Sequence, residues 1–290
     1  MSKLVLGTAQ FGMDYGINNR QGKIPRAEVF EILSESLSYG IDILDTAYSY
    51  GDSEVLIGEY IKKTNNAFKV ISKLPQCGLK ETKEIFMSSL KRISLDKIYG
   101  CLIHNFKIYS QTPELLDVLR ALKSQGKIEK IGLSLYYPSE AEIILKHKVD
   151  IDIIQVPYSI FDQRFAAYFP ELNRSGIEIY ARSVFLQGLV FIKPEDLEND
   201  FTKIRDKSRN LHLLSLQSGV PLVALCLNFA CIHDLINKVI IGVDSIHHFR
   251  EIVSSLDYLD EVKKIQMSLS DFKEDDENII LPINWKVGRG

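Results

Sequence analysis

Four side chains that can hold or move a proton occur among the first 104 residues, each at or just after the end of a short apolar run: Asp45, Tyr50, Lys73 and His104. A phenol with its ordinary pKa of about 10 is a poor acid at neutral pH, but a neighbouring ammonium favours phenolate and lowers that pKa. Asp45 would keep a buried Lys73 protonated, and His104 can donate a hydrogen bond to a substrate oxygen. Together these residue types predict a proton donor for an oxygen that gains charge during the reaction.

Eight short apolar runs, separated by helix-length segments, are the elements that would position these side chains. Apolar residues repeat at helical spacing between the runs, as at Val29, Ile32 and Leu33. Nearly continuous apolar strands are covered on both faces, and helix-length separations imply parallel pairing through right-handed crossovers. Eight such units predict an α/β fold, the (β/α)8 or TIM barrel. The runs are Lys3–Thr8, Ile41–Asp45, Phe68–Lys73, Ile98–His104, Ile131–Ser134, Ile153–Val156, Ile177–Ser183 and Val239–Gly242.

The carboxyl ends of the strands are where a barrel of this kind carries its chemistry. The second, third and fourth runs end in Asp45, Lys73 and His104, the fifth ends in Ser134, and Tyr50 lies in the loop after the second. The convergence of these loops at one mouth is what makes the five polar residues a predicted site.

Glycine residues between the apolar runs support the same alternation of strands and helices. Gly40, Gly126, Gly176 and Gly219 each stand where a helix would need a left-handed residue at its C-terminus. The polar stretch Lys193–Asn210 has little periodicity, and we expect it to be a long loop after the seventh strand.

Composition bounds the class of protein. The 290 residues are 46% hydrophobic and 25% charged with a net charge of −3, which indicates a globular chain with a large core. We expect one domain over residues 1–290, no nucleic-acid partner because no basic stripe is present, and no membrane segment or signal sequence. The four cysteines have no metal-ligand spacing, which predicts reduced thiols in a cytoplasmic protein. The sequence indicates no particular oligomeric state.

One segment carries a resemblance to a known family. Gly40–Glu54, which reads GIDILDTAYSYGDSE, with Lys73 and His104 at later strand ends, resembles the signature of the aldo-keto reductase superfamily. The resemblance covers nearly the whole chain and implies a TIM barrel, a nicotinamide cofactor and a catalytic tetrad of Asp45, Tyr50, Lys73 and His104. The other matching motifs are GTAQFG from Gly7, GLS from Gly132, QVPYS from Gln155, LQGL from Leu186 and IIGVDS from Ile240.

The same resemblance assigns residues to the cofactor. Ser134 and Gln155 match positions that hold the nicotinamide carboxamide, and Arg182 stands where many members have an aromatic ring stacked on the nicotinamide; a planar guanidinium can stack as well. The segment from Gly242 to Glu251 resembles the loop that holds the cofactor phosphate. The complete predicted set is Thr8, Ser134, Gln155, Arg182, Ser183, Gln187, Gly188, Gly242, Ser245, His248 and Glu251.

The sequence leaves two cofactors open, NADPH and NADH. The resemblance to the aldo-keto reductases favours NADPH. However, His248 and Ile252 replace the usual residues of the phosphate loop, and no lysine follows Gly242. NADH is therefore the alternative. The chain has no GxGxxG motif, so a dinucleotide would depend on the barrel's own phosphate loops. Leu135 also replaces an asparagine that usually follows Ser134, and His247 with His248 is interpreted as a surface pair without a metal.

The sequence leaves three functional classes open. The first is an NAD(P)H-dependent reductase of a small-molecule aldehyde or ketone, with hydride from the nicotinamide and a proton from Tyr50. The charged loop with Lys193 and Glu195 favours a polar, sugar-derived carbonyl slightly. The second is a Schiff-base aldolase or lyase with Lys73 as the amine nucleophile. The third is a cofactor-binding regulatory protein with little turnover.

Overall fold

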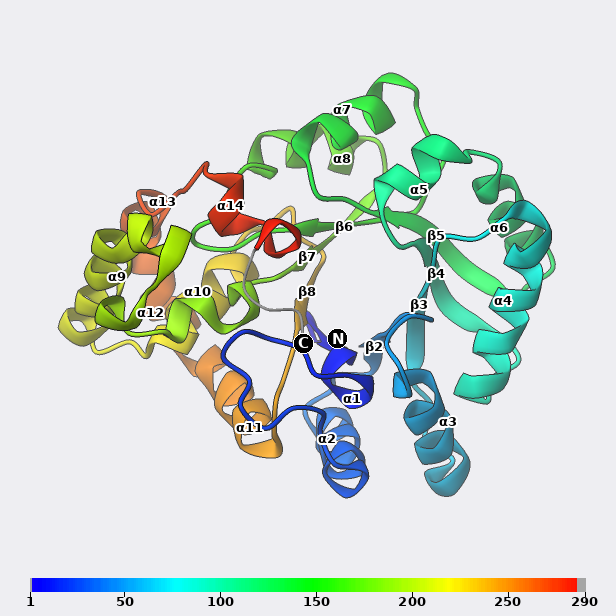
Figure 1. Ribbon diagram of the computed structural model, residues 1–290, viewed down its shortest axis with the longest axis horizontal. Helices are drawn as coiled ribbons and strands as arrows, with labels where there is room; N and C mark the ends of the chain where they lie inside the picture. Colours follow the sequence, from blue (N-terminus) through cyan, green and yellow to red (C-terminus); the bar gives the residue numbers. More distant parts are fainter. Residues whose placement is uncertain (1, 286–290) are drawn as a thin grey trace.

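The computed structural model describes residues 2–285, and a closed barrel of parallel strands surrounded by helices forms its centre (Figure 1). The strands follow one another around the barrel in sequence order, and β1 pairs with β8 to close it. They are β1 (Leu4–Gly7), β2 (Ile43–Asp45), β3 (Lys69–Leu74), β4 (Ile98–Ile103), β5 (Ile128–Ser134), β6 (Ile153–Pro157), β7 (Glu178–Arg182) and β8 (Lys238–Ile241). The predicted (β/α)8 barrel is confirmed, and each predicted run overlaps one strand.

The helices bury the faces that their apolar spacing predicts. Val29, Ile32 and Leu33 of α2 are fully buried, because residues three and four apart share one face of a helix. The α-helices are α1 (Ala9–Gly12), α2 (Arg26–Ser38), α3 (Ser53–Thr64), α4 (Leu79–Ile93), α5 (Phe106–Gln111), α6 (Leu115–Ser124), α7 (Pro138–Lys146), α8 (Phe169–Arg174), α9 (Arg205–Ser218), α10 (Leu222–Cys231), α11 (Ile246–Ser254), α12 (Leu259–Lys264), α13 (Gln266–Ser270) and α14 (Glu277–Ile280). The 3₁₀ helices are η1 (Ala166–Tyr168), η2 (Leu186–Phe191), η3 (Pro194–Asp196), η4 (Asn199–Ile204), η5 (Ser255–Tyr258) and η6 (Pro282–Asn284).

An apolar layer fills the lumen of the barrel. Seven strands each contribute one buried side chain to it: Val5, Ile43, Ile71, Leu102, Ile153, Tyr180 and Ile240. The remaining strand, β5, brings Gly132 to this level, where it pairs with Leu102 on one side and Ile153 on the other. The interior is therefore packed, as expected of a barrel of this size.

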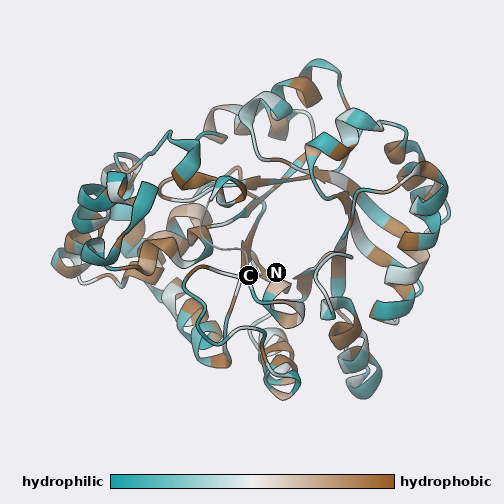
Figure 2. Cartoon of the chain, in the orientation of Figure 1, coloured by the Kyte–Doolittle hydropathy of each residue, from teal (hydrophilic) through white to brown (hydrophobic). Residues whose placement is uncertain are grey.

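A larger core lies between the strands and the helices, and the polar residues gather on the outer helix faces (Figure 2). Helix α10 is apolar on all sides and is buried from Val223 to Cys231. Within residues 2–285 no single helix is long and apolar enough to cross a membrane, although Asn199–Ser218 and Leu222–Cys231, bent by 96° at their junction, reach that length and composition together. All four cysteines are free thiols.

The sequence made two predictions about the segments between strands and helices, one about glycines at helix ends and one about a long loop after β7. The four glycines predicted at helix ends all have left-handed backbones, and Gly219 with φ 69° ends α9. The expected loop over Lys193–Asn210 is wrong in part, because η3 and η4 lie within it and α9 begins at Arg205. Helix α9 buries only Ser208 and Leu211, so its apolar periodicity is weak, and the ion pair of Lys207 with Glu274 helps to hold it.

Gly132→Ala should destabilise the barrel. An added Cβ would lie 2.0 Å from the carbonyl oxygen of Ile153 and 2.8 Å from a methyl carbon of Leu102. Overpacking of this kind should lower the free energy of unfolding by about 2 kcal/mol, measured by urea denaturation. Gly78→Ala, where the nearest atom would be 3.8 Å away, should cost less than about 1 kcal/mol. Equal losses in the two variants would contradict this account of the inner layer.

Candidate active site

One cavity of about 430 Å³ opens at the carboxyl ends of the strands. It is lined by all four residues of the predicted tetrad, Asp45, Tyr50, Lys73 and His104. Of the predicted cofactor residues, Thr8, Ser134, Gln155, Arg182, Ser183, Gln187, Gly188, Gly242, His248 and Glu251 line it as well, whereas Ser245 does not.

Side-chain alternation explains why these residues meet. Successive residues of a strand point to opposite faces, so the residue two positions beyond an inward-facing one also faces inward. Two positions beyond the apolar layer lie, from β1 to β8, Gly7, Asp45, Lys73, His104, Ser134, Gln155, Arg182 and Gly242. All eight line the cavity. We call this set the polar ring; it is the layer directly above the apolar one.

A buried ion pair forms one side of the polar ring. Lys73 Nζ lies 2.6 Å from Asp45 Oδ2, with the side chains only 2% and 6% exposed. Lys73 also donates a hydrogen bond of 2.9 Å to the carbonyl oxygen of Thr46. The side-chain amide of Gln155 donates to the other carboxylate oxygen of Asp45. The carboxylate thus bridges β3 and β6, and its charge is fully compensated by donors.

Tyr50 lies beside this pair. Lys73 Nζ is 5.1 Å from the centre of the Tyr50 ring, and the ring of His104 packs edge-on at 5.8 Å. The expectation that the ammonium lowers the phenol's pKa is wrong for the chain alone: burial raises the pKa of Tyr50, and the negative charge of Asp45 raises it further. The positive charge of Arg182 lowers the pKa of Tyr50, but burial and Asp45 outweigh it, so the phenol keeps its proton at neutral pH.

His104 is a neutral imidazole held by a residue that the sequence interpretation passed over. Burial, and after it the charges of Lys73 and Arg182, lower the pKa of His104 to about 3. Its Nδ1 lies 3.2 Å from the hydroxyl of Ser49. When this hydroxyl donates to Nδ1, the ring proton is on Nε2, and the imidazole can act as a hydrogen-bond donor.

The opposite side of the polar ring offers groups for an amide. Ser134 and Gln155 are neighbours across β5 and β6, and both are buried. Gln155 Oε1 is buried with no hydrogen-bond partner among the described residues. A buried acceptor of this kind is costly unless a ligand supplies a donor. A carboxamide fits that requirement, so the residues present suit a nicotinamide.

Arg182 comes after Gln155 in the polar ring, and its charge acts on both Tyr50 and His104. Its guanidinium lies 4.4 Å from the centre of the Tyr136 ring and donates to the carbonyl oxygen of Leu135 at 2.7 Å. Leu135, which replaces the family's usual asparagine, is completely buried. Arg182 has no ion-pair partner among residues 2–285, so its positive charge is available to the cavity.

Two loops that are far apart in the sequence meet at the cavity. The backbone N–H of Ile17, after β1, donates to the carbonyl oxygen of Gln187, after β7. The side chain of Gln187 donates to the hydroxyl of Tyr15. Gln187 has a left-handed backbone with φ 53° and precedes Gly188 with φ 92°, and this turn makes one wall of the mouth. Tyr15 and Asn18 also line the cavity.

The loop after β8 forms the far end of the cavity. Ser245 caps α11 by accepting a hydrogen bond from the backbone N–H of His248, which explains why its hydroxyl is not in the lining. His248 Nδ1 lies 3.6 Å from Asp244 Oδ2, and the interaction with this carboxylate raises the pKa of His248. Within residues 2–285 no group of three or more His, Cys, Asp or Glu side chains could hold a metal ion.

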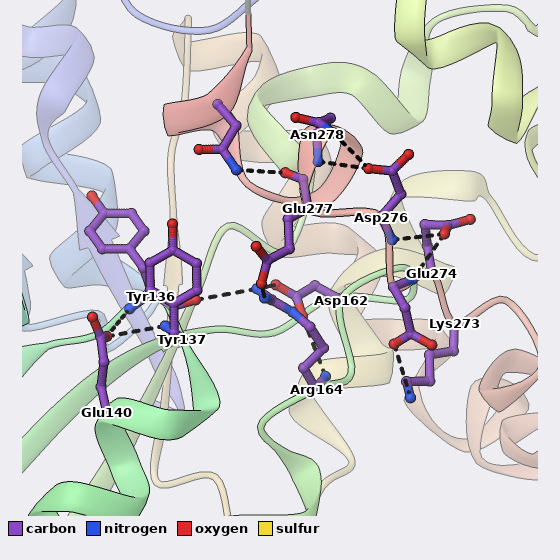
Figure 3. Close-up of polar contacts among 12 residues, drawn as sticks. Tyr136, Tyr137, Glu140, Asp162, Arg164, Lys273, Glu274, Asp276, Glu277 and Asn278 are labelled. Atoms are coloured by element: carbon purple, nitrogen blue, oxygen red, sulfur yellow. Dashed lines mark hydrogen bonds and ion pairs between the residues drawn. The ribbon is translucent and has the colours of Figure 1, made fainter.

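A polar cluster ties the C-terminal segment to the mouth (Figure 3). Arg164 binds Asp162 through two nitrogens, at 2.9 Å each, and reaches Glu277 of α14 at 2.9 Å. It also donates to the carbonyl oxygen of Tyr136, whose backbone N–H donates to Glu140. The segment around α14 is therefore linked to the aromatic ring that packs on Arg182.

Sequence reasoning missed several of these residues, and the available signals differ. Ser49 lies inside the motif of the tetrad, and Asp244 lies between two predicted cofactor residues, so position alone could have drawn attention to both. Tyr15 lies in a polar loop with no such signal. Arg164 and Glu277 are 113 residues apart, and no local pattern indicates that they meet.

The chain belongs to the aldo/keto reductase family, whose model matches residues 3–270. The members of this family are oxidoreductases that act on small carbonyl compounds with nicotinamide cofactors, and the barrel and its polar ring agree with that class.

Relatives and solved structures agree with this assignment. An uncharacterized oxidoreductase of Bacillus subtilis, YqkF, is 26% identical over 70% of this chain and 71% of its own. The NADH-specific methylglyoxal reductase of Escherichia coli is 27% identical over 66% and 65%. The holo form of an aldo-keto reductase from Bacillus halodurans, AKR11C1, has a similar fold with a TM-score of 0.77 at 23% identity, over 95% of this chain and 94% of that one.

Lys73→Met should destabilise the protein by leaving Asp45 as an unpaired buried charge. We expect the free energy of unfolding at neutral pH to fall by about 3 kcal/mol, measured by urea denaturation. Combining it with Asp45→Asn should cost less than the sum of the two single changes, because the charge to be compensated is then gone. Strict additivity would contradict the ion pair.

His104 should make stability depend on pH. Its pKa is lowered from 6.5 to about 3, so below 6.5 the unfolded chain binds a proton that the folded chain does not, and stability falls as pH falls. His104→Gln should therefore reduce the drop in Tm between about pH 7 and about pH 5. His147→Gln, at an exposed position after α7, should keep the full drop. Identical profiles for His104→Gln and the native chain would refute the assignment.

Proposed function

We propose that this protein reduces an aldehyde or ketone to an alcohol with NADPH or NADH, and that Tyr50 is the proton donor. The observation that carries the proposal is the arrangement around Tyr50: the phenol lies beside a buried Lys73–Asp45 ion pair and a neutral His104 in the same cavity. The Tyr50 hydroxyl has no hydrogen-bond partner among the described residues, which leaves it available to a substrate.

A nicotinamide cofactor, when bound, supplies the hydride that reduces the carbonyl carbon. Tyr50 delivers its proton to the carbonyl oxygen, which becomes strongly basic as it gains charge. His104 donates a hydrogen bond that orients this oxygen. Lys73 stabilises the phenolate that Tyr50 becomes, and Asp45 holds Lys73 in place. A raised pKa for Tyr50 suits this role, because the phenol stays protonated until the alkoxide forms.

Ser134 and Gln155 would hold the carboxamide, and the unpartnered Gln155 Oε1 supports that role. Arg182 would pack against the nicotinamide ring. Ser183, Gln187 and Gly188 would line the path of the phosphates from the side of the β7 loop. The sequence favours NADPH by family habit, and the relative from Escherichia coli is NADH-specific by name, so both cofactors belong in the first test.

The substrate class follows from the lining near Tyr50. Tyr15, Asn18, Gln187 and Arg182 offer hydroxyl, amide and guanidinium groups. These groups favour a small polar carbonyl, such as a sugar-derived aldehyde or ketone, over a large apolar one. The methylglyoxal reductase among the relatives also acts on a small carbonyl by name.

The two alternative functions have less support. A Schiff-base lysine must be neutral to attack a carbonyl, whereas Lys73 is in contact with the Asp45 carboxylate and donates to a second acceptor. A regulatory protein that binds cofactor without turnover has no feature in its favour here, since the proposed proton donor Tyr50, the hydrogen-bond donor His104 and the Lys73–Asp45 pair all line one cavity.

Tyr50→Phe should leave the affinity for reduced cofactor within about threefold of the native value, since it removes only a hydroxyl, and should lower kcat for carbonyl reduction about a hundredfold or more. Cofactor binding is followed by nicotinamide fluorescence, and turnover by its absorbance, with short aldehydes and aldose sugars as substrates. Tyr39→Phe, at a residue that is 52% exposed, is the matched control and should reduce carbonyls at the native rate. Native turnover by Tyr50→Phe would exclude Tyr50 as the acid.

A further inference from the structure

The cavity extends from the tetrad to the loop after β8, where its lining becomes acidic. Asp244 and Glu251 both line this end, together with Gln10, His248 and Ile252. Asp244 accepts a hydrogen bond of 3.3 Å from the side chain of Gln10. This acidic end belongs to the same cavity that Gln155 lines, and Gln155 Oε1 has no hydrogen-bond partner among the described residues.

If the nicotinamide lies against Tyr50 and Gln155, as the proposed function requires, the rest of the dinucleotide has to follow the cavity. Phosphates in barrels of this type bind at the loops after the seventh and eighth strands and at a helix N-terminus beside them. The polar ring has only glycines in that direction, Gly7 of β1 and Gly242 directly after β8. The side chain of Gln10 lies over Gly242, and the cavity continues past these residues to Asp244 and His248. The adenosine half would then lie against the segment from Asp244 to Ile252.

The charges at this end determine which adenosine fits. Asp244 and Glu251 are carboxylates, and His248 is the single cationic candidate among the described lining residues there, with its ring nitrogen already paired with Asp244. Arg250, one residue before Glu251, binds Glu31 and Glu35 on α2 instead and is not part of the lining. Lys73 and Arg182, the other cations of the cavity, lie beside the tetrad.

We propose that this protein prefers NADH, and that Asp244 makes the distinction by accepting a hydrogen bond from the 2′-hydroxyl of the adenosine ribose and repelling a 2′-phosphate. In Rossmann dinucleotide sites a carboxylate accepts a hydrogen bond from the 2′-hydroxyl of NADH, whereas an arginine accommodates the 2′-phosphate of NADPH. The same chemistry applies to a ribose beside Asp244. The inference rests on the proposed function for the location of the cofactor, and it replaces the expectation of NADPH that family habit gives.

The test is a fluorescence titration of the purified, cofactor-free protein with NADH and with NADPH. NADH should bind at least about tenfold more tightly. Asp244→Asn keeps the shape of the side chain and removes its charge, so it should tighten NADPH binding and reduce the preference about tenfold. Asp260→Asn, the same substitution at an exposed residue of α12 outside the cavity, should leave the preference unchanged. Asp244→Ser provides a second variant if the first folds poorly.

The outcomes separate this inference from the proposed function. If neither dinucleotide binds the native protein, the proposed function fails and this inference with it. If both bind and NADPH binds equally well or better, the nicotinamide site stands and the preference for NADH is overturned. If the preference is present but both folded Asp244 variants keep it in full, Asp244 is not its cause. Competition by 5′-AMP but not by adenosine 2′,5′-bisphosphate would support the preference for NADH without a variant.

Discussion

The buried ion pair between Asp45 and Lys73 is the interaction on which the site depends. Two opposite charges removed from water are tolerated only where their geometry is good and every remaining lone pair and proton has a partner. The barrel provides this, because Asp45 accepts from both Lys73 and Gln155, and Lys73 also donates to the backbone of Thr46. The pair links β2, β3 and β6 and gives Tyr50 a fixed electrostatic surrounding.

Much of this arrangement could be predicted from the sequence. Continuous apolar strands separated by helical segments allow only a few topologies, and the period of two then brings Asp45, Lys73 and His104 to one level. The direction in which the Tyr50 pKa shifts could not be predicted, because it depends on how deeply the phenol is buried and on the negative charge of Asp45 beside it. Long-range contacts such as that of Arg164 with Glu277 could not be predicted either, because no local sequence pattern indicates which distant charged residues meet.

The mouth of the cavity is made by segments that contribute nothing to the barrel's own hydrogen bonding. The loops after β1 and β7 hold each other through Ile17 and Gln187, and the C-terminal segment reaches Tyr136 through Arg164. Loops held by a few polar contacts open more easily than strands within a sheet. The barrel therefore holds the proposed reacting groups, whereas the segments around the mouth are the ones we expect to open first.

The two halves of the chain contribute different residues to the cavity. The residues proposed to handle the proton, Asp45, Tyr50, Lys73 and His104, all come from the first four strands and their loops. The positions above β5 to β8 supply Ser134, Gln155, Arg182 and Gly242. If the second half of the gene were exchanged for that of a relative, the residues proposed to face the coenzyme would be replaced and the proposed acid would stay in place. A barrel of this kind can change its cofactor during evolution while it keeps its proton donor.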